Sequence, residues 1–272
     1  MTESMQPVDT DVLIVGAGPT GLILSVELLR RGITCRVVDK LSGPSTTSRA
    51  IGIHARTLEL FEQMDIVEPF LESGWKSHAF QVYNKDKQIV RMTFGELETK
   101  YPYELCLIQP ETERILSEVL STKGGAIEWN TELLSFTQSL EGVTARVQKA
   151  GEGESAISCK WLVGCDGAHS LVRKLLDIGF PGTPYCEQYV LADIDFETTL
   201  DPSEHYLFSN EEGVVGFHPF SSEKARMFAE LGRIKHSRKI SDSMPADRVQ
   251  FAEPNLEELQ AILDRRGPGK VK

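Results

Sequence analysis

The fold of this chain is decided by the stretch Asp11-Val-Leu-Ile-Val-Gly-Ala-Gly-Pro-Thr-Gly21, in which a short apolar run leads into a glycine-rich turn. An apolar segment with helical periodicity follows the turn and ends at Arg31, just before Gly32. A second apolar run, residues 34–38, has the length and composition of a buried strand. This order predicts a strand–helix–strand unit whose two strands lie parallel in one sheet.

The spacing of the glycines predicts a dinucleotide-binding loop. Gly16 allows the tight turn from strand to helix, Gly18 lets a pyrophosphate approach the backbone, and Gly21 lets the helix pack against the strand. The N–H groups and dipole at the helix start can hold phosphates, and Asp39, after the second strand, can accept hydrogen bonds from an adenosine ribose. A glycine turn that only packs the unit is the alternative, but it leaves Asp39 unexplained. The loop alone does not distinguish one dinucleotide from another.

Composition narrows the class of protein. The 272 residues are 40% hydrophobic, enough for one large domain or two smaller ones. The net charge of −11 argues against a nucleic acid or an anionic membrane as partner, and no apolar run approaches the ~20 residues that span a bilayer. The polar, acidic N-terminus has no feature of a secretory or transit signal. The five cysteines are widely spread, which predicts reduced thiols in a cytoplasmic protein and no metal site.

A second motif, Cys165-Asp-Gly-Ala-His-Ser-Leu-Val-Arg173, follows another apolar run that predicts a buried strand. Asp166-Gly167 predicts a sharp turn, and Ser170 is placed to cap the helix that follows. The turn places Asp166 where a phosphate or a ribose would lie. A turn with no binding role is the alternative interpretation.

The remaining pattern predicts an α/β fold with two domains. We expect a Rossmann-like domain with a parallel sheet from residues 1–75 and 105–180, and a mostly antiparallel β domain from residues 76–104 and 181–272. Residues 80–94 alternate like a hairpin with a polar turn, and Asn255 begins a last helix. Aromatic residues of the second domain could line a ring-shaped pocket, although strand aromatics are more often core: Tyr206, Phe208, Phe217 and Phe220.

Three blocks together resemble the single-component FAD-dependent aromatic hydroxylases, the para-hydroxybenzoate hydroxylase and phenol hydroxylase group. The blocks are Gly16-Ala-Gly-Pro-Thr-Gly21, Arg49-Ala-Ile-Gly-Ile-His-Ala-Arg-Thr-Leu-Glu59 and the Asp-Gly motif at Cys165–Arg173. The Asp-Gly motif is the most specific of the three, because NAD-only dehydrogenases have no such turn at this place. The resemblance therefore implies FAD as the cofactor.

The resemblance also implies the roles of individual residues. The glycine loop would hold the FAD pyrophosphate through Gly16, Gly18, Pro19, Thr20 and Gly21, and Asp39 would bind the adenosine ribose. Arg49 would lie near the flavin and pyrophosphate, and Gln109 would contact the ribityl chain. The turn at Asp166 and Gly167 would serve both FAD and a transient NAD(P)H, with Arg173 in support. Arg49 as a solvated loop arginine, and His54 and His169 as structural histidines, are the competing interpretations.

The activity implied by the resemblance is NAD(P)H- and O2-dependent hydroxylation of a small phenolic or aromatic substrate through a flavin hydroperoxide. No residue is assigned as the catalytic base. Another FAD oxidoreductase on the same scaffold, such as a polyketide epoxidase or an isoprenoid reductase, is an alternative, and so is a non-catalytic fragment with weak nucleotide binding. The substrate, the choice of NADH or NADPH and a homodimeric state stay open.

The chain departs from the family pattern at its end. Family members carry a later Gly-Asp motif, and this dipeptide occurs nowhere in the sequence. An expressed or annotated fragment, a truncated gene product and half of a split enzyme would each account for this. A homodimer and a complementing C-terminal segment are the two partners left open, because a missing strand leaves an open sheet edge.

Overall fold

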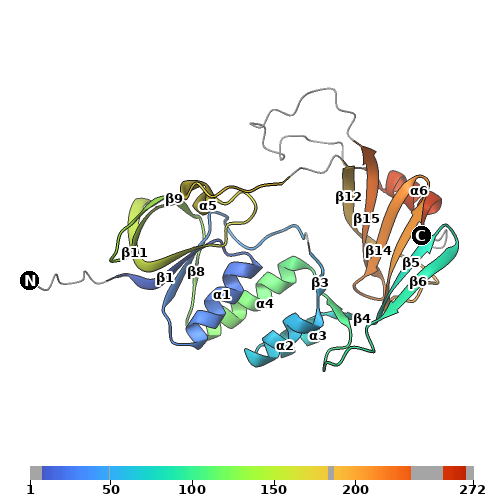
Figure 1. Ribbon diagram of the computed structural model, residues 1–272, viewed down its shortest axis with the longest axis horizontal. Helices are drawn as coiled ribbons and strands as arrows, with labels where there is room; N and C mark the ends of the chain where they lie inside the picture. Colours follow the sequence, from blue (N-terminus) through green and yellow to red (C-terminus); the bar gives the residue numbers. More distant parts are fainter. Residues whose placement is uncertain (1–7, 49, 183–186, 234–253, 268–272) are drawn as a thin grey trace, which may run out of the picture. The chain divides into compact units, whose positions relative to one another are not determined.

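The computed structural model describes residues 8–48, 50–182, 187–233 and 254–267 and divides into two compact units. Unit 1 comprises Met1–Ile51, Leu60–Ser73 and Leu107–Pro181, and unit 2 comprises Gly52–Glu59, Gly74–Cys106 and Gly182–Lys272. Figure 1 shows the elements of each unit along the chain. The assignment of nucleotide binding to the first unit and substrate binding to the second stays a prediction.

Unit 1 is built on a six-stranded sheet with the order β8-β2-β1-β11-β10-β9. Its first four strands run parallel, and β11, β10 and β9 pair antiparallel as a meander. This confirms the predicted α/β class with a parallel sheet. The bounds are β1 Thr10–Val15, β2 Cys35–Val38, β8 Ile127–Glu128, β9 Thr131–Gln138, β10 Val143–Lys149 and β11 Gly153–Gly164.

The helices of unit 1 cover this sheet with apolar faces. Helices α1 (Pro19–Arg30) and α4 (Gln109–Thr122) lie side by side, and they bury Leu22 and Val26 on α1 and Leu116 and Leu120 on α4 (Figure 1). Helices α3 (Val67–Ser73) and α5 (Leu171–Leu175) are shorter, and α2 (Ala55–Gln63) crosses the boundary between the units in sequence. The strand that follows β1 in the chain, β2, lies on one side of β1, and β11 lies on its other side. The order of strands therefore reverses at β1, and ligands of open α/β folds bind at the carboxyl end of the strands at such a switch point.

Unit 2 contains a six-stranded sheet with the order β12-β15-β14-β13-β5-β6. Its pairs are antiparallel except for β13 with β5, which confirms the expected mostly antiparallel sheet. A three-stranded sheet, β3-β7-β4, the first part of α2 and the helix α6 complete the described part of this unit. The bounds are β3 Gly52–Ile53, β4 Trp75–Ser77, β5 Ala79–Asn84, β6 Lys87–Thr93, β7 Glu104–Cys106, β12 Glu187–Asp195, β13 Glu204–Asn210, β14 Gly213–Pro219, β15 Lys224–Arg233 and α6 Leu256–Arg266.

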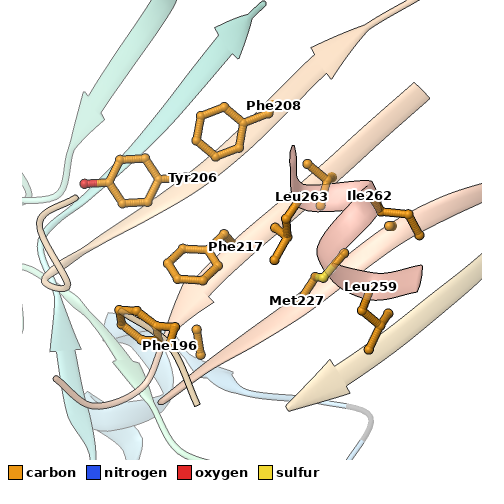
Figure 2. Close-up of a cluster of buried hydrophobic side chains, with 11 residues drawn as sticks. Phe196, Tyr206, Phe208, Phe217, Met227, Leu259, Ile262 and Leu263 are labelled. Carbon is orange, nitrogen blue, oxygen red and sulfur yellow. The ribbon is translucent and has the colours of Figure 1, made fainter. Parts of the chain in front are cut away.

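The core of unit 2 lies between its large sheet and α6, as Figure 2 shows. Tyr206, Phe208 and Phe217 are fully buried there against Ile262 and Leu263 of the helix. These strand aromatics are therefore core residues, the alternative that the sequence favoured over a ring-shaped pocket. The helix begins with a capping box, in which Asn255 Oδ1 accepts from the Glu258 amide at 3.0 Å and Glu258 accepts from the Asn255 amide at 2.9 Å.

Candidate functional site

The glycine loop joins the end of β1 to the start of α1 by a close approach of backbones. Gly16 has φ +107°, and its N–H donates to the carbonyl oxygen of Val38 at 2.9 Å. A Cβ at Gly16 would overlap the carbonyl oxygen of Cys165, and a Cβ at Gly21 would overlap that of Gly16. These two glycines are required by the packing of the loop itself.

Gly18 has a different role, because it is open to solvent. It lies at the N-cap of α1 in an extended conformation, and no atom lies within 4 Å of the position that its Cβ would take. No side chain caps the helix among the described residues, and Pro19 occupies the first turn. The first amides of a helix have no acceptor within it, so this start presents donors and a positive dipole to a phosphate.

Asp39 holds the loop in place. Its Oδ2 accepts from the Ala17 amide at 2.7 Å, and its Oδ1 accepts from the Leu41 amide at 2.8 Å. Each carboxylate oxygen has a second lone pair, so the group can still accept from the hydroxyls of a ribose. The acid that ends the second strand therefore stands directly beside the glycine loop.

Asp166 lies at the start of α5, where it satisfies backbone amides. Its Oδ2 accepts from the amides of Leu171 at 2.6 Å and Val172 at 3.2 Å, and its Oδ1 accepts from the Ser170 hydroxyl at 2.5 Å. Ser170 in turn accepts from the Arg173 amide at 3.0 Å, so the predicted cap is confirmed. The sequence did not predict that this carboxylate stabilises the turn. Its predicted contact with FAD and NAD(P)H stays a prediction.

The same turn is closed by Gly167 and Arg173. Gly167 has φ +75°, a conformation that side chains disfavour. The Arg173 guanidinium donates to the Ala168 carbonyl at 2.7 Å and lies over the ring of Phe180, 4.6 Å from its centroid. Arg173 thus braces the turn.

Gln109 and Glu113 tie the loop after β2 to α4. The Gln109 side chain donates to Glu113 Oε1 at 2.7 Å, and the backbone N–H of Gln109 donates to the Ser48 hydroxyl oxygen at 3.0 Å. Glu113 is only 3% exposed, and its Oε2 accepts from the Ser45 amide at 2.9 Å. Glu113 was not predicted as a site residue from the sequence. Its position three and seven residues before Leu116 and Leu120, on the apolar face of the helix, was the available signal.

These elements surround a cavity of about 490 Å³, within the range of small-molecule sites. Its lining brings together six of the predicted residues: Gly16, Gly18, Asp39, Gln109, Asp166 and Gly167. The cavity lining does not include the other four predicted residues that the structure describes. Pro19, Thr20 and Gly21 lie in the adjoining first turn of α1, and Arg173 contacts the Ala168 carbonyl of the Asp166–Gly167 turn. Arg49 lies outside the described residues.

The chemistry of the cavity suits a dinucleotide. It combines an open glycine at a helix start with a carboxylate, an amide side chain and the ring of Trp129, so phosphates, hydroxyls and a flat ring each have a suitable surface. Burial raises the pKa of the Cys165 thiol, which keeps this lining residue protonated and uncharged. Among the described residues, no histidine, cysteine or carboxylate cluster could hold a metal ion. None of the helices in the described ranges is long and apolar enough to cross a membrane.

Residues 9–258 match the family described as an FAD binding domain, and the chain belongs to this family of FAD-binding monooxygenases. It is 37% identical over 211 residues to 6-methylpretetramide 4-monooxygenase from Streptomyces rimosus, an alignment that covers 77% of this chain and 38% of the relative. It is also 37% identical over 216 residues to pentachlorophenol 4-monooxygenase from Sphingobium chlorophenolicum, with 77% and 40% covered.

Solved structures show the same fold. The p-nitrophenol 4-monooxygenase of Pseudomonas putida DLL-E4 aligns with a TM-score of 0.78 at 19% sequence identity, over 97% of this chain and 65% of that one. The chain therefore spans about two fifths of the length of the curated relatives it matches and about two thirds of this solved neighbour.

Proposed function

We propose that unit 1 binds FAD in the cavity at the glycine loop, and that the chain contributes this site to an NAD(P)H- and O2-dependent monooxygenase acting on a phenolic or other aromatic substrate. The observation that carries the proposal is the meeting of Gly18, Asp39, Gln109 and Asp166 around one cavity at the switch point of the sheet. When bound, FAD supplies hydride acceptance and activation of dioxygen. The chain supplies binding, orientation and exclusion of water.

Each residue of the cavity has a proposed task in holding FAD. The amides at Gly18, Thr20 and Gly21 would donate to the pyrophosphate, while Gly16 and Pro19 set the turn. Asp39 would accept from the adenosine ribose while it keeps its bond to Ala17. The remaining assignments are Gln109 to the ribityl chain, Asp166 and Gly167 to FAD and the transient NAD(P)H, Arg173 in support of the turn, and Arg49 near the flavin.

The first experiment is a visible absorption spectrum of the purified chain, followed by an FAD titration monitored through the fluorescence of Trp129 in the cavity lining. We expect saturable binding of FAD that quenches this fluorescence. Gly18→Ala should weaken binding, whereas Gly95→Ala, at a position with open space in unit 2, should not. A chain that stays colourless and ignores FAD would contradict the proposal.

The activity is tested separately from binding. Pentachlorophenol 4-monooxygenase and p-nitrophenol 4-monooxygenase are named for phenols, which supports a phenolic substrate for this chain. We expect oxygen uptake with FAD and NAD(P)H to rise when a phenol is added, and a hydroxylated product to form. Uptake without a hydroxylated product would favour another FAD oxidoreductase on the same scaffold.

A complementing segment is the partner that the sheet of unit 1 supports best. Strand β11 pairs with β10 only as far as Cys159, while residues 159–164 pair with β1 on the other side. The edge of residues 160–164 that faces away from β1 therefore has no strand beside it among the described residues. The nearby side chains of Trp161 and Leu176 are 70% and 46% exposed. Amide hydrogen exchange at residues 160–164 should slow when a complementing segment is added. If a second copy of the chain covers this edge, analytical ultracentrifugation should show a homodimer.

A further inference from the structure

One row of side chains crosses the large sheet of unit 2 on the face opposite α6. The register pairs Phe80 with His205, His218 with Arg226, and Arg226 with Asp193. His205 and His218 lie side by side on β13 and β14, with ring centroids 4.5 Å apart. Because neighbouring residues of a strand point to opposite faces, these histidines face away from the core that Tyr206 and Phe217 form with α6.

The His205 side chain contacts two residues of β7. Its Nε2 lies 3.4 Å from Cys106 Sγ and 3.6 Å from Glu104 Oε2. The residue is 1% exposed, and its Nδ1 is buried with no hydrogen-bond partner among the described residues. A buried polar atom without a partner is uncommon in folded proteins and points to a ligand or to a catalytic use.

Glu104 is placed by the backbone of β3. Its carboxyl lies over the α-carbon of Gly52, where any Cβ would overlap Oε1. Burial raises the pKa of Glu104, an effect that the nearby His54 opposes in part, so this carboxylate binds a proton more readily than an exposed one. His54 itself is exposed.

The groups around His205 keep its ring neutral. Burial lowers the pKa of His205 to about 3, and His218 and His54 add to this effect. Burial and then Arg226 lower the pKa of His218 to about 4, and Arg226 itself pairs with Asp193 at 2.7 Å. Burial raises the pKa of the Cys106 thiol, which keeps it protonated. A neutral imidazole carries one N–H and one bare nitrogen, so it can accept a proton on one side while it releases one on the other.

We propose that Glu104 and His205 form a proton-transfer dyad for the hydroxyl of a phenolic ligand. The O–H bond of the phenol breaks, its proton goes to His205 Nδ1, and the electron pair stays on the oxygen. The proton already on Nε2 passes to the Glu104 carboxylate, so phenol and carboxylate become phenolate and carboxylic acid while the imidazole stays neutral. The 3.6 Å between Nε2 and Oε2 shortens to hydrogen-bond reach in the complex, as is common for catalytic pairs. The rings of Phe80 and His218 lie beside the His205 ring, with centroids 6.4 Å and 4.5 Å from its centroid.

This inference rests on the proposed phenolic substrate, and 4-nitrophenol tests both, because its neutral and ionised forms absorb at different wavelengths. In the wild-type chain we expect bound 4-nitrophenol to ionise at a lower pH than the free probe. Glu104→Gln removes the proton acceptor, and Gly52→Ala displaces Glu104 without changing its charge. Each variant should raise the pKa of the bound probe by about 1, a tenfold change in proton affinity, with little change in probe affinity. Gly95→Ala, at a glycine whose Cβ would meet open space, is the matched control.

The outcomes separate the dyad from the proposed function. Equal ionisation of the bound probe in wild type, Glu104→Gln and Gly52→Ala would overturn the dyad and leave phenol binding intact. No binding of the probe to the wild-type chain would overturn the phenolic substrate and the dyad together. Should either variant fail to fold, ¹⁵N spectra of the histidine rings in the wild-type chain decide, since the dyad requires the His205 proton on Nε2. A proton on Nδ1 would overturn it.

Discussion

Alanine at Gly16 and alanine at Gly18 should separate stability from FAD binding, although the two glycines are only two residues apart. Gly16 is enclosed by the backbone of the Cys165 turn and has φ +107°. Gly18 is extended and has open space where its Cβ would be. Gly16→Ala should therefore destabilise unit 1, whereas Gly18→Ala should leave its stability almost unchanged and obstruct the approach of a pyrophosphate.

The magnitude for Gly16→Ala follows from two contributions. A non-glycine residue held at this positive φ costs about 1–3 kcal/mol. The overlap of the new Cβ with the Cys165 carbonyl requires β1 and β11 to separate, and such overpacking costs about 1–3 kcal/mol more. The expected loss is thus about 2–6 kcal/mol of the free energy of unfolding of unit 1. Gly18→Ala meets neither cost and should remain within about 0.5 kcal/mol of wild type.

Urea unfolding followed by tryptophan fluorescence measures the first effect, because Trp129 and Trp161 both lie in unit 1. FAD titration of the folded chains measures the second, and Gly18→Ala should bind at least tenfold more weakly. Unfolding of Gly16→Ala at the wild-type urea concentration would refute the expected loss of stability. Binding of FAD to Gly18→Ala as tightly as to wild type would refute the expected role of Gly18.

Three further expectations follow from contacts in the two units. Asp39→Asn should raise the FAD dissociation constant about 10- to 150-fold, because hydrogen bonds to a charged group contribute about 1.5–3 kcal/mol. Calorimetric titration with FAD would measure this, with Asp86→Asn, at an exposed position, as the control. Leu263→Ala should cost unit 2 about 2–5 kcal/mol in urea unfolding, since the side chain is 4% exposed, and an equal midpoint would contradict the described core. The buried His205 and His218 have pKa values of about 3 and about 4, below the ordinary 6.5, so the stability they support is complete above pH 6.5 and is lost as the pH falls through 4 towards 3. Unfolding at a series of pH values should show that replacing both with glutamine flattens this acid-side loss.

Local patterns in the sequence predicted the elements that depend on neighbouring residues. The glycine loop, the cap at Ser170 and the hairpin of β5 and β6 are all present, because turn chemistry and periodicity act over a few residues. The family and its FAD-binding fold were also predicted, from three motifs that lie far apart in the chain.

The parts that were missed depend on partners distant in sequence. The parallel pairing of β13 with β5 joins residues more than 120 positions apart, and nothing in either strand specifies it. Glu113 was overlooked because its partners, Gln109 and the Ser45 amide, meet it only once the loop folds onto α4. The same holds for Glu104 on β7 and His205 on β13, which only the tertiary fold brings together.

The pairing of β1 with β11 has a consequence for the time at which the proposed nucleotide site can form. Thr10 pairs with Cys159, which lies 149 residues later in the chain. The strand before the glycine loop therefore cannot form this pairing until β11 has been synthesised. At a synthesis rate of about 5–20 residues per second, that neighbour emerges roughly 7–30 s after β1. During this interval one edge of β1 is exposed and the Cys165 turn is not there to hold Gly16. The proposed site for FAD is thus among the last parts of unit 1 to be completed, although its glycine loop is made well before β11.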